Sequence, residues 1–299
     1  MRALRIMGLT AFLAVFLTGP ALAAEAPVGL GTAGGYAVLA YSTVTNTGPT
    51  TITGDVGLHP GSAVTGFGSV TLHGTQHVAD AAALQAKNDL VTAYNSAAGR
   101  TPTTVGTELG GHTFTAGVYN TQNGKLGLTG VVTLDAQGDP NAVFIFQAAS
   151  TLTTASGSSV ALANATQACN VFWKVTSSAT LGTSSAFAGN ILALASITLT
   201  TGARLTGSAL AQTGAVTLDT NVITRAVCST SGGAQPPAGT TPVPGGVLPP
   251  TTGGTPPPTS TSGSGDSGSG PGAALMVLIA GLAAAAAFVT VRRLDTIRR

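Results

Sequence analysis

The chain has 299 residues and a formal net charge of +2, and only 7% of its residues are charged. Between Val28 and Cys228 it has seven Asp or Glu and six Lys or Arg, a formal net charge of −1. A surface that binds phosphate groups needs clustered Lys and Arg, so we expect no nucleic acid partner. A surface so poor in charge must be covered by Thr, Ser, Asn, Gly and Ala, which favours recognition of something uncharged.

Residues 1–23 have the pattern of a secretory signal peptide. Arg2 and Arg5 precede an apolar stretch at residues 6–17, and Ala21-Leu22-Ala23 forms a cleavage site with small residues. The alternative is an uncleaved anchor, for which the apolar stretch is short. We therefore predict export, with a mature chain that begins at Ala24.

Residues 78–98 contain no Gly or Pro and much Ala, which predicts an α-helix that ends at Gly99. One face of this helix is formed by residues at helical spacing: Ala83, Ala86, Leu90, Tyr94 and Ala97. Because most of these side chains are small, the face can lie close to a β-sheet. The helix would be about 31 Å long.

The rest of residues 24–228 is rich in Thr and Val, is punctuated by Gly and predicts short strands. A Thr-Leu-x-Thr motif starts at Thr151, Thr180, Thr198 and Thr217, and a weaker form starts at Thr133. The spacing of about 18 residues accommodates three strands and three corners, which is one triangular coil of a solenoid. We expect the central Leu or Phe of each strand to point inward. Six or seven coils stacked about 4.8 Å apart would match the predicted helix, which we place along one side.

The two cysteines, Cys169 and Cys228, are predicted to form a disulfide, because export permits one. Such a bond would pin the end of the folded domain, since Cys228 directly precedes a segment with almost no large apolar residue. The alternative is two buried thiols.

Residues 229–272 consist mainly of Pro, Gly, Ser and Thr and predict a disordered, extended linker. Residues 248–253 (LPPTTG) resemble a wall-sorting motif with one extra residue, which leaves covalent wall attachment as an alternative to a membrane anchor.

Residues 273–291 form an uncharged apolar run that is about long enough to cross a bilayer as a helix. The tail at residues 292–299 carries Arg292, Arg293, Arg298 and Arg299, and basic residues stay on the cytoplasmic side. We therefore predict a single-pass cell-membrane protein with residues 24–228 outside the cell and the C-terminus in the cytoplasm.

No catalytic or metal-binding pattern is evident, so we expect no enzymatic activity, no cofactor and no metal. His73 and His77 are four residues apart, but Gly74 between them argues against a shared helix. Some β-helices are polysaccharide lyases or glycosidases, which need paired carboxylates or clustered basic residues in a groove. The seven acidic residues here are scattered along the domain.

Several motifs resemble those of the microbial β-helical ice-binding (antifreeze) proteins. They are residues 54–67 (GDVGLHPGSAVTGF), 109–111 (LGG), 116–119 (AGVY), 138–147 (GDPNAVFIFQ) and 168–173 (ACNVFW). The resemblance spans residues 30–228. It implies an all-β domain, a right-handed, three-faced parallel β-helix with one long α-helix alongside, in which coils from before and after the helix interleave.

The same resemblance implies ice binding through a flat face rich in Thr and Ser. If Leu points inward in each motif, its neighbours point outward, which selects Thr151, Thr153, Thr180, Thr198, Thr200 and Thr217, with Thr154, Thr183 and Thr201 at the edge. Gly182 and Asp219 interrupt this grid, and Thr is a good strand former anywhere, so another face is an alternative. The competing hypothesis is a cell-surface adhesin or structural β-helix domain without ice activity. In either case we expect a monomer.

Overall fold

The computed structural model describes residues 25–229. The predicted signal peptide, the linker beyond Ser229, the predicted membrane span and the basic tail therefore lie outside the described residues. Within residues 25–229, no helix combines the length and the hydrophobicity that crossing a membrane requires.

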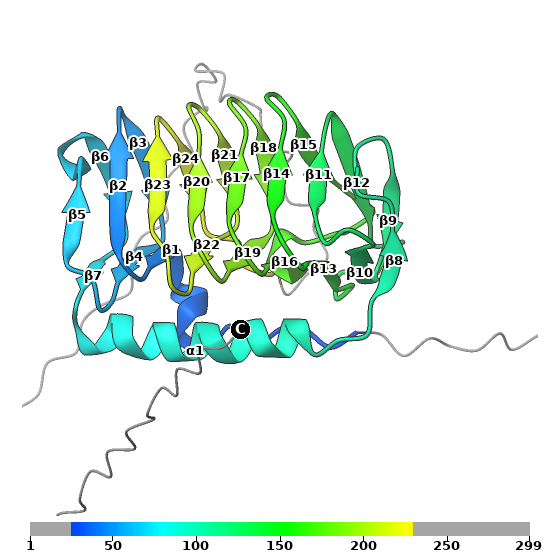
Figure 1. Ribbon diagram of the computed structural model, residues 1–299, viewed down its shortest axis with the longest axis horizontal. Coiled ribbons are helices and arrows are strands. Elements are labelled where there is room, and N and C mark those ends of the chain that lie inside the picture. The colour runs from blue at the N-terminus through cyan, green and yellow to red at the C-terminus, as the bar shows by residue number, and fades with distance from the viewer. Residues whose placement is uncertain (1–24, 230–299) are drawn as a thin grey trace, which may run out of the picture. The chain divides into compact units, whose positions relative to one another are not determined.

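The described chain winds into a three-sided solenoid of parallel strands (Figure 1). Sheet A has the order β7 (Gln76–Val78), β4 (Asp55–Leu58), β1 (Tyr36–Ala40), β22 (Ala209–Ala211), β19 (Asn190–Ala193), β16 (Val171–Val175), β13 (Phe144–Ala148), β10 (Gly117–Thr121) and β8 (Thr103–Val105). Sheet B has the order β11 (Leu126–Leu128), β14 (Leu152–Thr154), β17 (Ala179–Leu181), β20 (Ile197–Leu199), β23 (Val216–Asp219), β2 (Thr43–Thr47) and β5 (Ala63–Thr65). Sheet C has the order β6 (Val70–His73), β3 (Thr50–Thr53), β24 (Val222–Thr224), β21 (Arg204–Thr206), β18 (Ala186–Ala188), β15 (Ser159–Ala163), β12 (Val131–Asp135) and β9 (Thr113–Thr115).

Each complete coil contributes one strand to each sheet, as the repeat of about 18 residues predicted, and only the coils next to α1, which contain β7 and β8, are incomplete. Short 3₁₀ helices lie at Gly31–Gly35 (η1), Phe67–Ser69 (η2) and Ala168–Asn170 (η3). The weaker motif at Thr133 belongs to β12 of sheet C, so it is not equivalent to the other motifs, which lie in sheet B.

The order of the coils in the stack differs from their order in the sequence. The first coils, β1 to β7, lie at one end, and α1 (Ala81–Ala98) then carries the chain to the other end. From β8 onward, successive coils stack in the direction of the first coils, until the last coil, β22 to β24, pairs with the coil of β1 to β3. In this junction Val38 pairs with Ala209, Val44 with Val216 and Ile52 with Ile223. The implied interleaving of coils is therefore confirmed.

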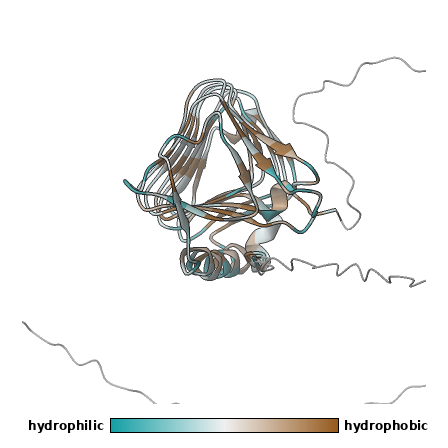
Figure 2. Ribbon diagram, turned by 90° about the vertical axis from the view of Figure 1, so that its right-hand side faces the viewer, coloured by the Kyte–Doolittle hydropathy of each residue, from teal (hydrophilic) through white to brown (hydrophobic). Residues whose placement is uncertain are grey.

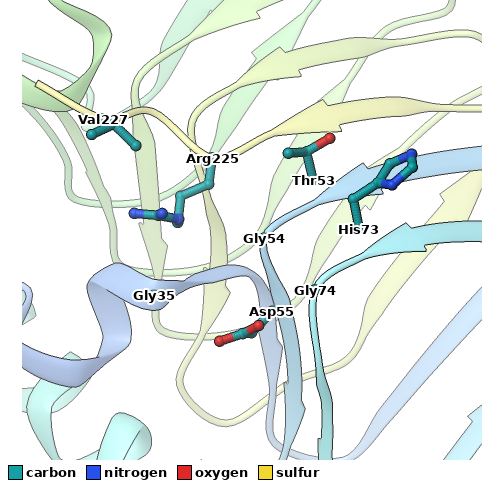
Figure 3. A pocket seen from close by; sticks show the side chains of 8 residues that line it. All are labelled: Gly35, Thr53, Gly54, Asp55, His73, Gly74, Arg225 and Val227. Carbon is teal, nitrogen blue, oxygen red and sulfur yellow. The ribbon is translucent and has the colours of Figure 1, made fainter. Parts of the chain in front are cut away.

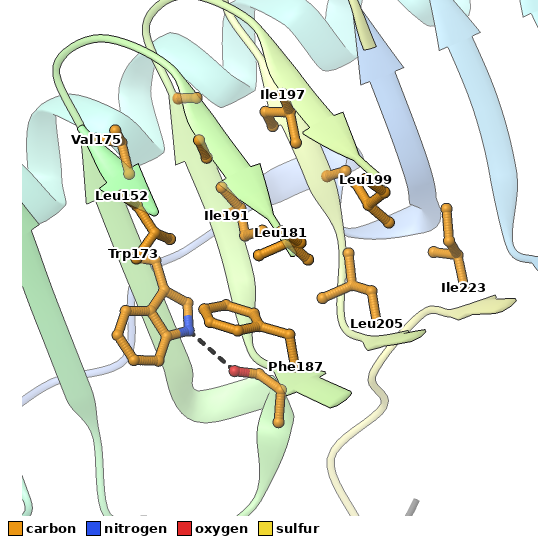
Figure 4. Close-up of a cluster of buried hydrophobic side chains, with 14 of the residues drawn as sticks. Leu152, Trp173, Val175, Leu181, Phe187, Ile191, Ile197, Leu199, Leu205 and Ile223 are labelled. Atoms are coloured by element: carbon orange, nitrogen blue, oxygen red, sulfur yellow. Dashed lines mark hydrogen bonds between the residues drawn. The ribbon is translucent and has the colours of Figure 1, made fainter. Parts of the chain in front are cut away.

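Inward-facing side chains from successive strands fill the interior of the solenoid. Leu181, Leu199, Leu205 and Phe187 point inward as predicted (Figure 4). The rings of Phe146 and Trp173 stack with centroids 4.3 Å apart. The Trp173 indole Nε1 donates a hydrogen bond to the Ala188 carbonyl at 2.9 Å, so its one polar group is satisfied inside the core.

The prediction that every central Leu points inward is wrong for sheet A. Leu192 and Leu210 point away from the interior and pack beneath α1, while their small neighbours Ala193 and Ala209 face the core. The helix thus provides a second apolar environment on the outer side of this sheet (Figure 2).

Helix α1 begins three residues later than predicted, because residues 76–78 pair as strand β7 and Asp80 caps the helix. The Asp80 carboxylate accepts a hydrogen bond from the Ala83 amide at 2.8 Å, which satisfies an otherwise free donor of the first turn. The predicted face of Ala83, Ala86, Leu90, Tyr94 and Ala97 is buried throughout, and the helix contacts strands of sheet A from β7 to β13.

The packing of α1 can be tested with two neighbouring residues. Leu90 is fully buried on the side of α1 that faces sheet A, whereas Val91 lies on the outer side of the helix and is 44% exposed. Leu90→Ala should lower the free energy of unfolding by about 2–5 kcal/mol, because it leaves a cavity between helix and sheet. Val91→Ala, the control, should change it by no more than about 0.5 kcal/mol. Equal losses in urea denaturation would contradict this packing.

Candidate functional site

Sheet B is the regular sheet that the helix leaves bare. Sheet A is buried on both sides, by the core and by α1. In sheet B, most inward positions of successive strands hold Leu, Ile, Val or Ala, and the residue between two inward positions faces solvent. Strand register therefore decides which side chains form the outer surface of this sheet.

The register of sheet B aligns six threonines in one uninterrupted outward row. Paired residues on neighbouring strands are, in order, Thr153, Thr180, Thr198, Thr217, Thr45 and Thr65. We call these residues the threonine row; Gly127 continues it on β11. Neighbouring strands are about 4.8 Å apart, so the hydroxyl and methyl groups recur at that interval. At the end of the row, the hydroxyls of Thr65 and Thr45 are 3.3 Å apart.

Small side chains flank the threonine row on both sides. On the side where the strands begin, the outward positions hold Thr151, Ser178, Ser196, Ala215, Thr43 and Ala63. On the other side, which is less regular, Gly182 and Thr200 directly follow β17 and β20, and Asp219 pairs with Thr47. The Thr200 hydroxyl turns back to donate to the Leu181 carbonyl at 2.7 Å, which leaves its methyl group on the outside.

The predicted site residues fall into four places. Thr153, Thr180, Thr198 and Thr217 lie together in the threonine row, and Thr151 and Thr200 lie in the flanking rows. Thr183 and Thr201 lie beyond the strands, at the edge between sheets B and C, where the Thr183 and Thr200 hydroxyls are 3.4 Å apart. Thr154 points inward instead of lying at the edge, and its hydroxyl accepts a hydrogen bond from the Gly182 amide at 2.8 Å.

The first motif is offset by two residues from the others. The sequence equates Thr151 with Thr180, but the structure pairs Thr180 with Thr153 and Leu181 with the position of Thr154. A shift of two residues preserves the alternation of a strand, so Thr151 and Thr153 both still face outward.

The sequence reasoning missed Thr43, Thr45 and Thr65, which lie on β2 and β5 before the helix. Their local alternation with Val44 and Val64 was a usable signal for half-buried strands. Nothing local, however, indicates that β2 pairs with β23, which is far away in the sequence.

Buried asparagines hold the corners that follow the threonine row. The Asn221 amide donates to the carbonyls of Thr200 at 2.9 Å and Ala203 at 3.0 Å. Asn46 donates in the same way to Gly48 at 2.8 Å and to Gly66 at 3.1 Å. These bonds satisfy carbonyl groups that a turning chain removes from the ladders, so the edge between sheets B and C is fixed from inside.

Charged groups lie at the margins of sheet B. Asp219, in a flanking position, accepts hydrogen bonds from the hydroxyls of Thr201 and Thr220. Glu108 pairs with Gly127 at the last strand. Burial would raise the pKa of Glu108, but the amides of Gly110 and Thr129 donate to its carboxylate and lower the pKa below its usual value. The threonine row itself has no charged member.

Sheet C is also bare, but its outer rows are more mixed. Exposed Arg204 and Val222 occur in one row, and His73 ends the next one beside Thr53. On the outer surface of sheet C, charged and bulky side chains therefore interrupt the rows of small neutral ones.

Among the residues that the structure describes, the histidines lie apart and do not meet in one site. His73 lies on sheet C and His77 on sheet A, where its Nδ1 is 2.9 Å from the Asp80 carboxylate. In residues 25–229, no three His, Cys, Asp or Glu side chains are grouped to hold a metal ion.

A cleft of about 320 Å³ at the edge between sheets C and A is lined by Asp55, His73 and Arg225 among glycines (Figure 3). Asp55 accepts from the Thr75 amide at 2.8 Å, and Arg225 donates to the Gly34 carbonyl at 3.2 Å. Both side chains thus support the backbone, and a single carboxylate offers no acid–base pair.

The fold and sheet B together define the class of protein: a three-sided parallel β-helix with one helix along one face and, on another face, an ordered row of threonines that has no charged member. The model of the ice-binding-like family matches residues 38–224. An ice-binding protein of Nostoc sp. (strain HG1) is 53% identical over 200 residues, which cover 66% of this chain and 74% of that protein.

Solved structures agree with this assignment. The crystal structure of an ice-binding protein from an Antarctic biological consortium has a TM-score of 0.66 and 44% identity, and the match covers 75% of this chain and 97% of that one. For an ice-binding protein from the Antarctic ascomycete Antarctomyces psychrotrophicus, the TM-score is 0.65 and the identity 41%, with coverage of 67% and 99%. The chain therefore belongs to the ice-binding-like family.

The corner before β23 depends on a buried lysine of α1. Only 6% of Lys87 is exposed, and its ammonium group donates to the carbonyls of Ala211 and of Gln212, the latter at 2.8 Å. Both carbonyls lie where the chain turns from sheet A into sheet B, and the group also lies over the Tyr41 ring. Burial lowers the pKa of Lys87 to about 7.

This lysine predicts a pH dependence of stability. Between pH of about 7 and its ordinary value of 10.5, Lys87 binds a proton in the unfolded chain but not in the folded one. The free energy of unfolding should therefore rise with pH through this window. Lys87→Met should flatten the rise when urea denaturation is compared from about pH 7 to 9.5, below the pKa of Tyr36, which burial raises to about 12. An unchanged slope in the variant would contradict the assignment.

Proposed function

We propose that the protein binds ice through the outer side of sheet B, with the threonine row at the centre of the contact. The observation that carries this proposal is the register that places six threonines side by side without a charged residue among them. Membership of the ice-binding-like family supports it, as does the name of the Nostoc relative.

The spacing of the outward side chains and the rigidity of the strands suit sheet B to contact with ice. Outward residues recur at about 6.7 Å along a strand and about 4.8 Å between strands, which forms a grid of hydroxyl and methyl groups. Each strand of the row except the edge strand β5 is fixed on both sides by a backbone ladder, and the core supports the row from beneath. Water ordered on such a grid can join a crystal lattice, whereas charged side chains would hold water in their own arrangement.

A pair of matched substitutions tests which sheet contacts ice. Thr198 is in the middle of the threonine row, and Thr224 is an exposed, outward threonine of sheet C. Thr198→Tyr should abolish most thermal hysteresis and inhibition of ice recrystallisation, because the ring lifts the sheet away from ice. Thr224→Tyr should keep both activities, and circular dichroism should show that both variants are folded.

The outcomes separate the competing functions. Loss in Thr224→Tyr alone would move the ice contact to sheet C. Absence of both activities in the wild-type protein would instead favour an adhesin or structural domain without ice activity.

We further propose that the β-helix is exported and tethered to the cell membrane by residues 273–291, with the C-terminus in the cytoplasm. The support is the sequence pattern: a signal peptide, a Pro- and Thr-rich linker, an apolar run and four arginines after it. A domain held in this way would attach its cell to ice or shield the surroundings of the cell from crystal growth.

Tethering is tested by fractionation of cells that produce the full chain or a chain that stops before residue 273. The full chain should remain with the membrane and be accessible to protease from outside, because only the short basic tail is predicted to be inside. The shortened chain should appear in the medium. Retention of both chains in the cytoplasm would contradict export, and release of the full chain would contradict the anchor.

A further inference from the structure

The last coil of the sequence is an interior coil of the stack. Strand β23 lies between β20 and β2, so Thr217 separates Thr198 from Thr45 in the threonine row. Strand β24 likewise lies between β21 and β3. Removal of this coil would therefore divide the solenoid, take Thr217 out of the threonine row and leave parts of three and two threonines.

The chain leaves this coil by the edge between sheets C and A, which is the edge opposite sheet B. The Arg225 amide donates to the Thr53 carbonyl at 2.9 Å, after which the chain reaches η3. There Cys228 is joined to Cys169 by a disulfide, with the Cα atoms 5.4 Å apart. The Ser229 amide also donates to the Gln167 side chain at 2.6 Å.

The disulfide joins the exit of the chain to a different coil. Cys169 lies in η3, directly before β16, and β16 contributes Trp173 to the core. A force applied beyond Ser229 would otherwise pull first on β24 and break its ladders one hydrogen bond at a time. With the disulfide closed, that force passes to Cys169, and residues between the two cysteines form a loop that cannot be extended.

We propose that the Cys169–Cys228 disulfide is a force-carrying latch, which keeps the last coil in the stack when a tether pulls on the C-terminal end of the domain. This proposal deepens the proposed function, because it gives a tethered domain the means to keep its threonine row intact under tension. Sheet B and the exit of the chain lie on opposite sides of the solenoid. If ice holds sheet B while a tether pulls at Ser229, the force therefore passes through the body of the domain.

Single-molecule pulling on the full chain tests the latch without ice. One handle is attached at the C-terminus and the other, by a non-natural side chain, at Ser156, an exposed turn residue after β14. The wild-type protein is compared with Cys169→Ala/Cys228→Ala. Gln167→Ala is the matched control, because it removes the neighbouring hydrogen bonds to Ser229 but keeps the disulfide.

The double variant should show a first event, absent from the wild type, at lower force than the first wild-type event. That event should lengthen the chain by about 70 Å, since about 20 residues, from the start of β22 to Cys228, are released at about 3.4 Å each. Gln167→Ala should behave like the wild type. If the double variant does not fold, reducing agent added to wild-type molecules already held between the handles opens the same bond in the folded protein.

A first event at the same force with the disulfide open or closed would overturn the latch. Such a result leaves the ice contact untouched, because that contact is measured separately on Thr198→Tyr in free solution. Without tension, the double variant should retain the ice activity of the wild type at low temperature. Loss of that activity in a folded, untethered variant would mean that the disulfide shapes the bare sheet itself, and would also overturn the latch.

Discussion

The structure depends on in-register stacking of parallel backbone ladders. Each complete coil bonds to the next complete coil through all three sheets, so one residue position in one coil fixes the corresponding position in its neighbours. Shifting a strand by one residue would turn its outward threonine into the core and an inward leucine into solvent, which the hydrophobic cost forbids. The apolar interior therefore sets the arrangement of hydroxyl groups on the outside.

The three sheets divide the tasks of the domain. Sheet A is apolar on both sides and attaches the helix, while sheet B presents small neutral side chains and leaves the charged ones at its margins. Lys87 links the two, since its ammonium group bonds the carbonyls at the corner before β23. The helix thus supports the bare sheet without touching its outer surface.

Local patterns predicted the coil, the helix and the buried helix face. The reason is that the repeat length and the alternation of apolar and polar residues can be recognised in short segments such as residues 197–211. They misjudged Leu192 and Leu210, since a strand buried on both sides reads as a continuous apolar run and conceals which way each side chain points. They also missed Thr45 and Thr65, whose place in the row depends on pairing between β2 and β23 across most of the domain. Such long-range pairing has no local signature.

The central claim is that the threonine row is the surface in contact with ice. Solid-state NMR on frozen protein with labelled threonine methyl groups measures this contact directly, as magnetisation passes from ice protons to nearby methyl groups. The account predicts strong transfer to Thr180, Thr198 and Thr217 and weak transfer to Thr92, which is exposed on the outer side of α1. Transfer to Thr92 as strong as to the threonine row would contradict it.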